Sequence, residues 1–105
     1  MIFYVTDIFS AQITRLVTDE SYAELQKLLI ADPESGDLIR GSQGLRKIRW
    51  RLPGTGKSGG IRVIYYLVTN DEVFMLFAYP KGKQENISDD QARVLRGLVD
   101  KHLAL

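Results

Sequence analysis

Lysine, arginine and tyrosine are the side chains with which this chain of 105 residues could do chemistry. It has no cysteine, and its single histidine, His102, follows Lys101 near the end of a predicted helix, a position typical of a solvated residue. Asp89 and Asp90 suit the first turn of that helix, where the dipole favours anions, better than they suit a metal pair. We therefore expect no metal site and no cofactor. The remaining candidates for chemistry are Lys57, Arg62, Tyr65, Tyr66, Tyr79, Lys81 and Lys83.

The basic residues are concentrated in the middle of the chain. Between Asp37 and Asp71 there are seven positive charges and no negative charge, although the net charge of the whole chain is only +1. Clustered cations favour phosphate binding, because they recover free energy by releasing condensed counterions. The alternative is a solvated strand face whose charges keep a sheet edge soluble. The seven are Arg40, Arg46, Lys47, Arg49, Arg51, Lys57 and Arg62.

Residues 46–52 alternate with a period of two, as in a β-strand. The apolar side chains share one face of this strand: Ile48, Trp50 and Leu52. The basic side chains share the other face: Lys47, Arg49 and Arg51. The alternation predicts a basic stripe and not scattered charge, so it favours the interpretation as a phosphate-binding surface.

Residues 56–58, Gly-Lys-Ser, are similar to the end of a nucleotide-binding phosphate loop. That motif needs a glycine where this chain has Arg51, and a helix after the lysine, where this chain has two glycines and a strand. We therefore reject nucleotide binding of this type. Residues 53–60 are expected to form a loop between two strands that contacts a polyanion or a partner.

Three helices are predicted from their caps and apolar stripes. Asp7 is the expected N-cap of the first helix, and Thr18 is the expected N-cap of the second. The second helix ends before Pro33, because the residue that precedes a proline is disfavoured in a helix. The third helix follows Ser88, which can form a capping box with Gln91.

Four strands are expected, at residues 2–5, 46–52, 61–68 and 73–79. The last two are apolar on both faces and should lie centrally in the sheet. The order β-α-α-β-β-β-α predicts an α+β fold whose antiparallel sheet is covered on one face by helices. From the length and the apolar fraction of 45%, we expect residues 1–105 to form a single domain.

Nothing in the sequence indicates a membrane or an export signal. No apolar stretch approaches the ~20 residues that a membrane-spanning helix needs. The N-terminus lacks the basic region of a signal peptide, and the absence of cysteine fits a reducing compartment. We therefore expect a cytoplasmic protein that does not bind membranes.

The segment from Gly41 to Tyr66, GSQGLRKIRWRLPGTGKSGGIRVIYY, resembles the RelE/HigB-like toxins of type II toxin–antitoxin systems. Their pattern runs Gly-Leu-Arg-Lys-Ile/Leu-Arg, then a Gly/Lys loop, then Gly-Gly-x-Arg-x-Ile-Tyr-Tyr. A later part of the family pattern is similar to residues 79–81 and 85–88 of this chain. The chain departs from the family at Gly82-Lys83, where relatives commonly have a polar residue and an acid.

The resemblance implies a ribosome-dependent endoribonuclease that cuts the mRNA codon in the aminoacyl site and is inhibited by a cognate antitoxin. Its partners would be the ribosome, mRNA and the antitoxin, with no small-molecule cofactor. RNA cleavage without a metal uses the ribose 2′-hydroxyl as nucleophile and needs a base, an acid and stabilisation of the charged phosphorane. Neighbouring cations make a lysine a better base by lowering its pKa, and arginine suits phosphoryl oxygens.

For this chemistry we expect Lys81 to be the base, Arg62 to stabilise the phosphate and Lys57 to be a phosphate contact or acid. Tyr79 is a weaker candidate for stacking or orientation. The residues expected to hold ribosomal RNA and mRNA are Lys47, Arg49, Arg51, Arg46 and Lys83. Two alternatives stay open: a ParE-like inhibitor of DNA gyrase with the same fold, and a non-catalytic RNA-binding module.

Overall fold

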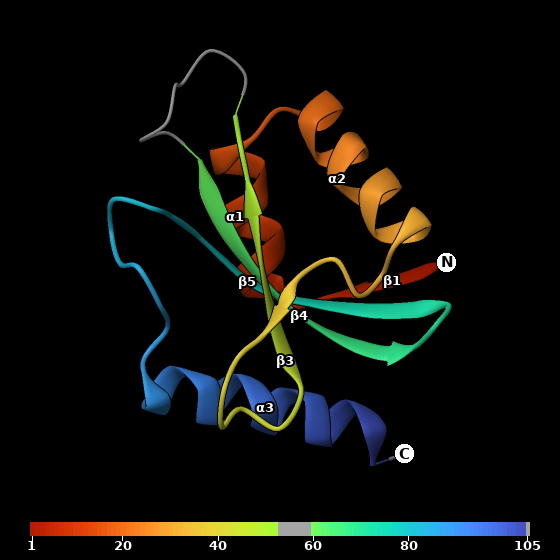
Figure 1. Cartoon of the computed structure of the whole chain (residues 1–105), viewed down its shortest axis with the longest axis vertical. Helices are drawn as coiled ribbons and strands as arrows, with labels where there is room; N and C mark the ends of the chain where they lie inside the picture. The colour runs from red at the N-terminus through yellow and green to blue at the C-terminus, as the bar shows by residue number, and fades with distance from the viewer. Residues whose placement is uncertain (53–59, 105) are drawn as a thin grey trace.

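The structure is a computed structural model that describes residues 1–52 and 60–104. These residues form three helices and a five-stranded sheet, which confirms the predicted α+β class (Figure 1). Of the helices in the described ranges, none is both long and apolar enough to cross a bilayer. Apart from Gly60, the expected loop at residues 53–60 lies outside the described residues. In chain order the elements are β1 (Ile2–Val5), α1 (Asp7–Leu16), α2 (Asp19–Ala31), β2 (Asp37–Leu38), β3 (Leu45–Trp50), β4 (Ile61–Thr69), β5 (Glu72–Pro80) and α3 (Asp89–Leu103).

The strands are ordered β1-β5-β4-β3-β2 across the sheet. As expected, β3, β4 and β5 are antiparallel neighbours, and the short β2, which has no pattern in the sequence, extends the sheet beyond β3. β1 runs parallel to β5, with Ile2 opposite Glu72 and Val5 opposite Met75. The expectation of a purely antiparallel sheet is therefore wrong. A short hairpin forces two strands to be antiparallel, but β1 is connected to the next strand through two helices. This long connection allows β1 to pair in the parallel direction.

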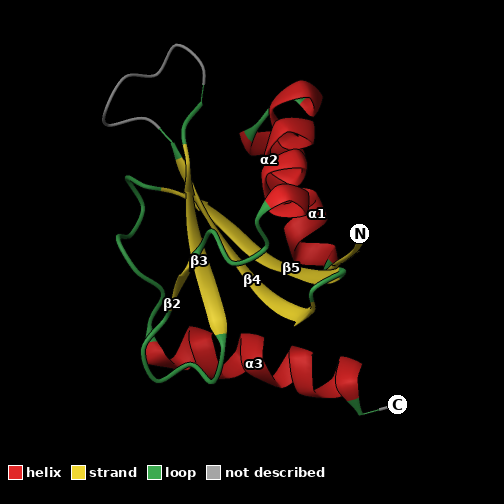
Figure 2. Cartoon of the chain, turned by 45° about the vertical axis from the view of Figure 1, so that its right-hand side comes forward, coloured by secondary structure: helices red, strands yellow, loops and turns green. Residues whose placement is uncertain are grey.

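Helices cover both faces of the sheet, and the expectation that they cover only one is also wrong (Figure 2). α1 and α2 pack on one face, where Phe9 and Leu25 join a core with Val63 of β4. α3 packs on the other face, where Leu95 and Val99 join a second core. The physical reason lies in β4 and β5, which are apolar on both faces and need cover on both sides.

The helix starts follow the predicted capping chemistry, with one shift. The N-cap of α1 is Thr6, whose hydroxyl accepts from the amide of Phe9, while Asp7 lies in the first turn. Thr18 caps α2 and Ser88 caps α3 as expected, and Ser88 and Gln91 form the complete capping box. Because this box fixes where α3 begins, it also fixes where the segment of residues 81–88 must end.

Candidate functional site

Three basic side chains lie together on the face of the sheet that α3 only partly covers. Arg49 of β3 is directly opposite Arg62 of β4, and Arg62 is directly opposite Tyr79 of β5. In the neighbouring row, Lys47 is opposite Ile64. Directly opposed side chains in antiparallel strands have Cβ atoms about 4.5–5.5 Å apart. Lys47, Arg49 and Arg62 are called the cationic face below.

Arg62 is the most constrained member of the cationic face, because only 6% of its surface is exposed. Its Nη1 donates a long hydrogen bond of 3.4 Å to the carbonyl oxygen of Ile61. Its buried Nε has no hydrogen-bond partner among the described residues. A buried polar group without a partner costs about 1–3 kcal/mol, more if charged. Arg62 therefore has one hydrogen-bond donor that no described residue satisfies.

Glu85 is the carboxylate that faces Arg62. Its Oε1 lies 4.0 Å from Nη2 of Arg62, at the limit for an ion pair, and 59% of its side chain is exposed. Arg62 itself is buried, so water reaches this long pair only on the side of Glu85.

Tyr79 lies beneath the segment of residues 81–88 and is only 4% exposed. Its hydroxyl donates to the carbonyl oxygen of Glu85 at 3.3 Å. Burial raises the pKa of Tyr79 above the usual value of 10.0, while the positive charge of Arg62 acts in the opposite direction. Tyr79 can thus orient Arg62 and Glu85, but it is too buried to stack on a base.

The segment of residues 81–88 runs over the cationic face, and side chains of that face contact it. Lys47 Nζ donates to Oδ1 of Asn86 at 2.5 Å, in addition to the contact between Arg62 and Glu85. Lys81 directly follows β5, and its amide donates to the carbonyl oxygen of Gly60. Within the described part of the chain, neither Lys81 nor Lys83 has a side-chain partner. Both ammonium groups are consequently available to a ligand.

Two of the other predicted site residues, Arg46 and Arg51, are not part of this arrangement. Arg46 lies on the opposite face of the sheet, where its Nη1 donates to the carbonyl oxygens of Gly36 at 2.8 Å and Glu34 at 3.2 Å. Arg51 comes after the end of β3, which stops at Trp50, and lines a hollow next to α2. Lys57 lies outside the described residues.

Sequence reasoning missed the parts that Glu85 and Asn86 play in the site. The residues of this segment have no period, so nothing in the sequence indicated that they fold back over the sheet. The only available signal was the distance along the chain between the end of β5 and the capping box at Ser88. In the described ranges, residues 1–52 and 60–104, no group of three or more His, Cys, Asp or Glu side chains could hold a metal ion.

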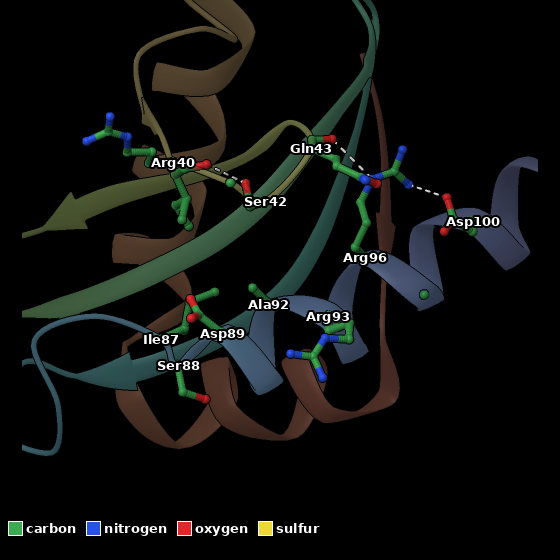
Figure 3. A pocket seen from close by; sticks show the side chains of 13 residues that line it. Arg40, Ser42, Gln43, Ile87, Ser88, Asp89, Ala92, Arg93, Arg96 and Asp100 are labelled. Atoms are coloured by element: carbon green, nitrogen blue, oxygen red, sulfur yellow. Dashed lines mark hydrogen bonds and ion pairs between the residues drawn. The ribbon is translucent and has the colours of Figure 1, made fainter.

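A second basic region lies between α3 and the turn that joins β2 to β3 (Figure 3). It surrounds a hollow of about 560 Å³, but its best-placed arginine is already occupied. Arg96 donates from Nε to the carbonyl oxygen of Gln43, pairs with Asp100, and stacks 5.0 Å from the ring centre of Tyr66. These contacts attach α3 to the turn, so the region is better explained by structure than by binding.

The sequence of residues 31–105 matches a protein family described as the RelE toxin of RelE / RelB toxin-antitoxin system. The matched part contains β2 to β5, α3 and every residue of the cationic face.

Proposed function

Because the chain belongs to the RelE toxin family of toxin–antitoxin systems, we propose that it inhibits translation as a ribosome-dependent mRNA endoribonuclease. It would act in the cytoplasm and be held inactive by its cognate antitoxin. The observation that carries the proposal is the state of Arg62, which is buried, opposite Arg49, and has an Nε without a partner among the described residues. This is the environment expected of a side chain that completes its hydrogen bonds with a phosphate.

In the proposed reaction, the ribose 2′-oxygen attacks the adjacent phosphorus, and the bond from phosphorus to the 5′-oxygen breaks. Lys81 takes the proton of the 2′-hydroxyl, and Lys57 gives a proton to the leaving oxygen. Arg62 stabilises the negative charge of the phosphorane, with Arg49 beside it, because a preorganised cation in a site of low dielectric favours the transition state. The products are a 2′,3′-cyclic phosphate and a 5′-hydroxyl.

The RNA strand would be held mainly through its phosphates. Lys47 and Arg49 are on the same face as Arg62, and Lys83 is close to Lys81 in the chain. Arg51 directly follows β3 and would contact ribosomal RNA. Arg46 is given no RNA contact, because its guanidinium is occupied by backbone carbonyls.

The ribosome is part of the proposal because the site has few means of orienting a flexible strand. Single-strand binders normally stack bases on exposed aromatic rings, and Tyr79 is buried. A codon held by the ribosome would arrive already positioned, and positioning of reactants is worth several kcal/mol of the barrier. We therefore expect the protein to cut ribosome-bound mRNA much better than naked RNA.

The decisive experiment compares one message in two forms, free and bound to 70S ribosomes with a defined codon in the aminoacyl site. Cleavage should occur at codon-defined positions only in the ribosomal complex, and the 5′ fragment should end in a 2′,3′-cyclic phosphate. Arg62→Ala should abolish cleavage. Equally efficient cutting of free RNA, or a 3′-hydroxyl end, would contradict the proposed mechanism.

Two further measurements separate the proposal from its alternatives. A gyrase inhibitor would cause DNA breaks in growing cells and leave the message intact. A non-catalytic RNA-binding module would bind ribosomes with a strong dependence on salt, but the message would stay whole. Intact mRNA in cells that have stopped growing would therefore overturn the proposed function.

A further inference from the structure

The chain just before α3 is held in place by a network of side-chain amides. The Nε2 of Gln84 donates to the carbonyl oxygen of Asn86 and to Oε1 of Gln91, both at 2.9 Å. The same Oε1 of Gln91 accepts from the amide of Ser88 at 2.8 Å, as part of the capping box of α3. Ile87, between Asn86 and Ser88, is buried in the second core. The backbone of Asn86 is therefore fixed by contacts on both sides of it.

From this fixed backbone the side chain of Asn86 reaches Lys47 of β3. Its Oδ1 accepts from the ammonium nitrogen of Lys47 at 2.5 Å. Among the residues that the structure describes, Lys47 forms no ion pair with a carboxylate. An ammonium group has three donors, and Asn86 uses one of them. Lys47 is therefore held by one neutral acceptor, and its other two N–H groups are left for a ligand.

The neutrality of Asn86 matters because its neighbour in the chain is charged. Glu85 presents a carboxylate to Arg62 at 4.0 Å, whereas Asn86 presents an amide oxygen to Lys47. A carboxylate in hydrogen-bond contact with Lys47 would offset much of its positive charge. An amide oxygen orients the ammonium group but leaves that charge on the cationic face. Lys47 is thus kept in place and still attracts anions.

Holding a lysine in this way has a consequence for binding. The lysine side chain is long and flexible, and it loses conformational entropy when a ligand fixes it. In the free chain, Lys47 is already ordered by Asn86, on the same face as Arg49 and Arg62. Less order then has to be imposed when RNA binds, and such preorganisation raises affinity without adding a contact.

We propose that Asn86 is a positioning residue for RNA binding: its side-chain oxygen holds the ammonium group of Lys47 in place and, being neutral, leaves the charge of Lys47 to an RNA phosphate. This inference rests on the proposed function, which gives Lys47 a phosphate to contact. Asn86 acts through Lys47 and takes no part in the cleavage step. It should therefore affect how tightly the RNA complex forms and not how fast the bound RNA is cut.

The test replaces Asn86 by aspartate, which has the same shape and keeps the oxygen that faces Lys47 but adds a negative charge. Asn70→Asp is the matched control, because Asn70 is the other asparagine of the chain and is exposed. It lies about 20 Å along β4 from Ile64, the residue opposite Lys47, so salt screens its charge from the site. Binding is measured to the 70S complex described above, with a 2′-O-methyl group on the codon to prevent cleavage.

Asn86→Asp should bind the complex about tenfold more weakly and with a smaller dependence on salt, because one phosphate-binding cation is lost. Asn86→Ala should bind about threefold more weakly, since Lys47 keeps its charge but loses its position. Asn70→Asp should bind within about twofold of the unchanged chain. On the cleavable message, all three variants should keep the cleavage rate at saturating ribosomes within about twofold. Equal losses from Asn70→Asp and Asn86→Asp, or a lower saturated rate for Asn86→Asp, would overturn the proposal.

The same substitution in a Lys47→Met background separates positioning from direct repulsion of RNA. If Asn86 acts through Lys47, adding Asn86→Asp to Lys47→Met should change binding by no more than about twofold. A second full loss would mean that the carboxylate repels RNA by itself, and would overturn the proposal. Asn86→Asp should also melt at the temperature of the unchanged chain or higher, because its carboxylate can pair with Lys47. A lower melting temperature would assign the weaker binding to a less stable fold.

A measurement without RNA distinguishes failure of this inference from failure of the proposed function. In ¹⁵N relaxation of the lysine ammonium groups, Lys47 should be more ordered than Lys83, and Asn86→Ala should remove the difference. Equal mobility of the two lysines in the unchanged chain would overturn the inference even if the chain cuts mRNA. An ordered Lys47 in a chain that binds the 70S complex but cuts no message would remove the cleavage reaction and leave the role of Asn86 in place. No binding by the unchanged chain would remove both.

Discussion

Arg49 and Arg62 are directly opposite each other on neighbouring antiparallel strands. Like charges in this relationship are destabilising, and burial of Arg62 increases the cost because it removes water from the charge. The ion pair that opposes this cost, from Arg62 to Glu85, is long and largely exposed on the side of Glu85. In the proposed function, a bound phosphate would relieve this repulsion between the two arginines.

Replacement of Arg62 by methionine should separate stability from activity. Methionine fills the same space without a charge, so Arg62→Met should leave the free energy of unfolding unchanged or raise it by about 1 kcal/mol, the cost of one unsatisfied polar group. The cleavage rate should fall by roughly 10²–10³, as is typical when one transition-state contact is lost. Urea unfolding and single-turnover cleavage measure the two effects.

Arg46→Met is the matched control for that experiment. Arg46 is also a partly buried arginine of this sheet, but its Nη1 donates to two backbone carbonyl oxygens, those of Gly36 and Glu34. Its loss should destabilise the fold by about 1–3 kcal/mol, because those carbonyls lose their partner. A larger destabilisation from Arg62→Met than from Arg46→Met would contradict our view of the site.

Lys81 and Lys83 should differ in their effects on the chemical step. Both variants Lys81→Met and Lys83→Met remove one positive charge from the same turn, so electrostatic attraction of RNA should fall equally. Only the base should affect the rate of the bound complex, and loss of a general base typically costs 10²–10⁴-fold. We expect this loss for Lys81→Met under single-turnover conditions with saturating ribosomes. The opposite ranking would assign the base to Lys83.

Glu72 should make part of the stability dependent on pH. The hydroxyl of Tyr4 donates to Oε1 of Glu72 at 2.7 Å, and this bond, followed by that from Thr69, lowers the pKa of Glu72 below its usual 4.5. The stabilisation is therefore complete above pH 4.5 and disappears as the pH falls through the lower pKa of the folded state.

The melting temperature of the unchanged chain should consequently fall more steeply below pH 4.5 than that of Glu72→Gln. Tyr4→Phe removes the largest cause of the shift and should reduce the difference between the two curves. Parallel curves for the unchanged chain and Glu72→Gln would show that Glu72 titrates alike in the folded and unfolded chain.

Tyr65 should contribute stability without contributing to activity. It is fully buried, its hydroxyl accepts from the amide of Gly36 at 2.9 Å, and it donates to the carbonyl oxygen of Pro33 at 2.8 Å. Tyr65→Phe leaves both backbone groups without this partner and should cost about 1–3 kcal/mol in the free energy of unfolding. Cleavage at a temperature where the variant is folded should stay within twofold of the unchanged chain. A selective loss of cleavage would place Tyr65 in the site.

The sequence was sufficient to predict those elements whose local signals agree with their final environment. The N-cap residues Thr18 and Ser88 correctly predicted where α2 and α3 begin. The alternation of apolar and basic residues correctly predicted β3 as a strand. Local patterns did not predict that β1 runs parallel to β5, or that α3 lies on the opposite face of the sheet from α1 and α2. Both depend on pairing and packing between residues far apart in the chain, for which no local pattern exists.

The candidate site shows the same division. Period-two alternation placed Lys47 and Arg49 on one face, and the observed register adds Arg62 and Tyr79 to it. Alternation failed at Arg51, because β3 ends one residue earlier. The contacts of Arg62 and Tyr79 with Glu85 could not be foreseen, because the course of residues 81–88 depends on where α3 begins.

The pairing of β1 with β5 has a consequence for the synthesis of this protein. Residues 2–5 leave the ribosome well before residues 72–75, with which they pair in the folded protein. The row from Arg49 through Arg62 to Tyr79 is likewise incomplete until β5 has emerged. For most of its translation, the nascent chain therefore lacks the strand pairing that aligns Arg49 and Arg62. The ribosome that synthesises the protein meets the assembled site only after β5 has emerged.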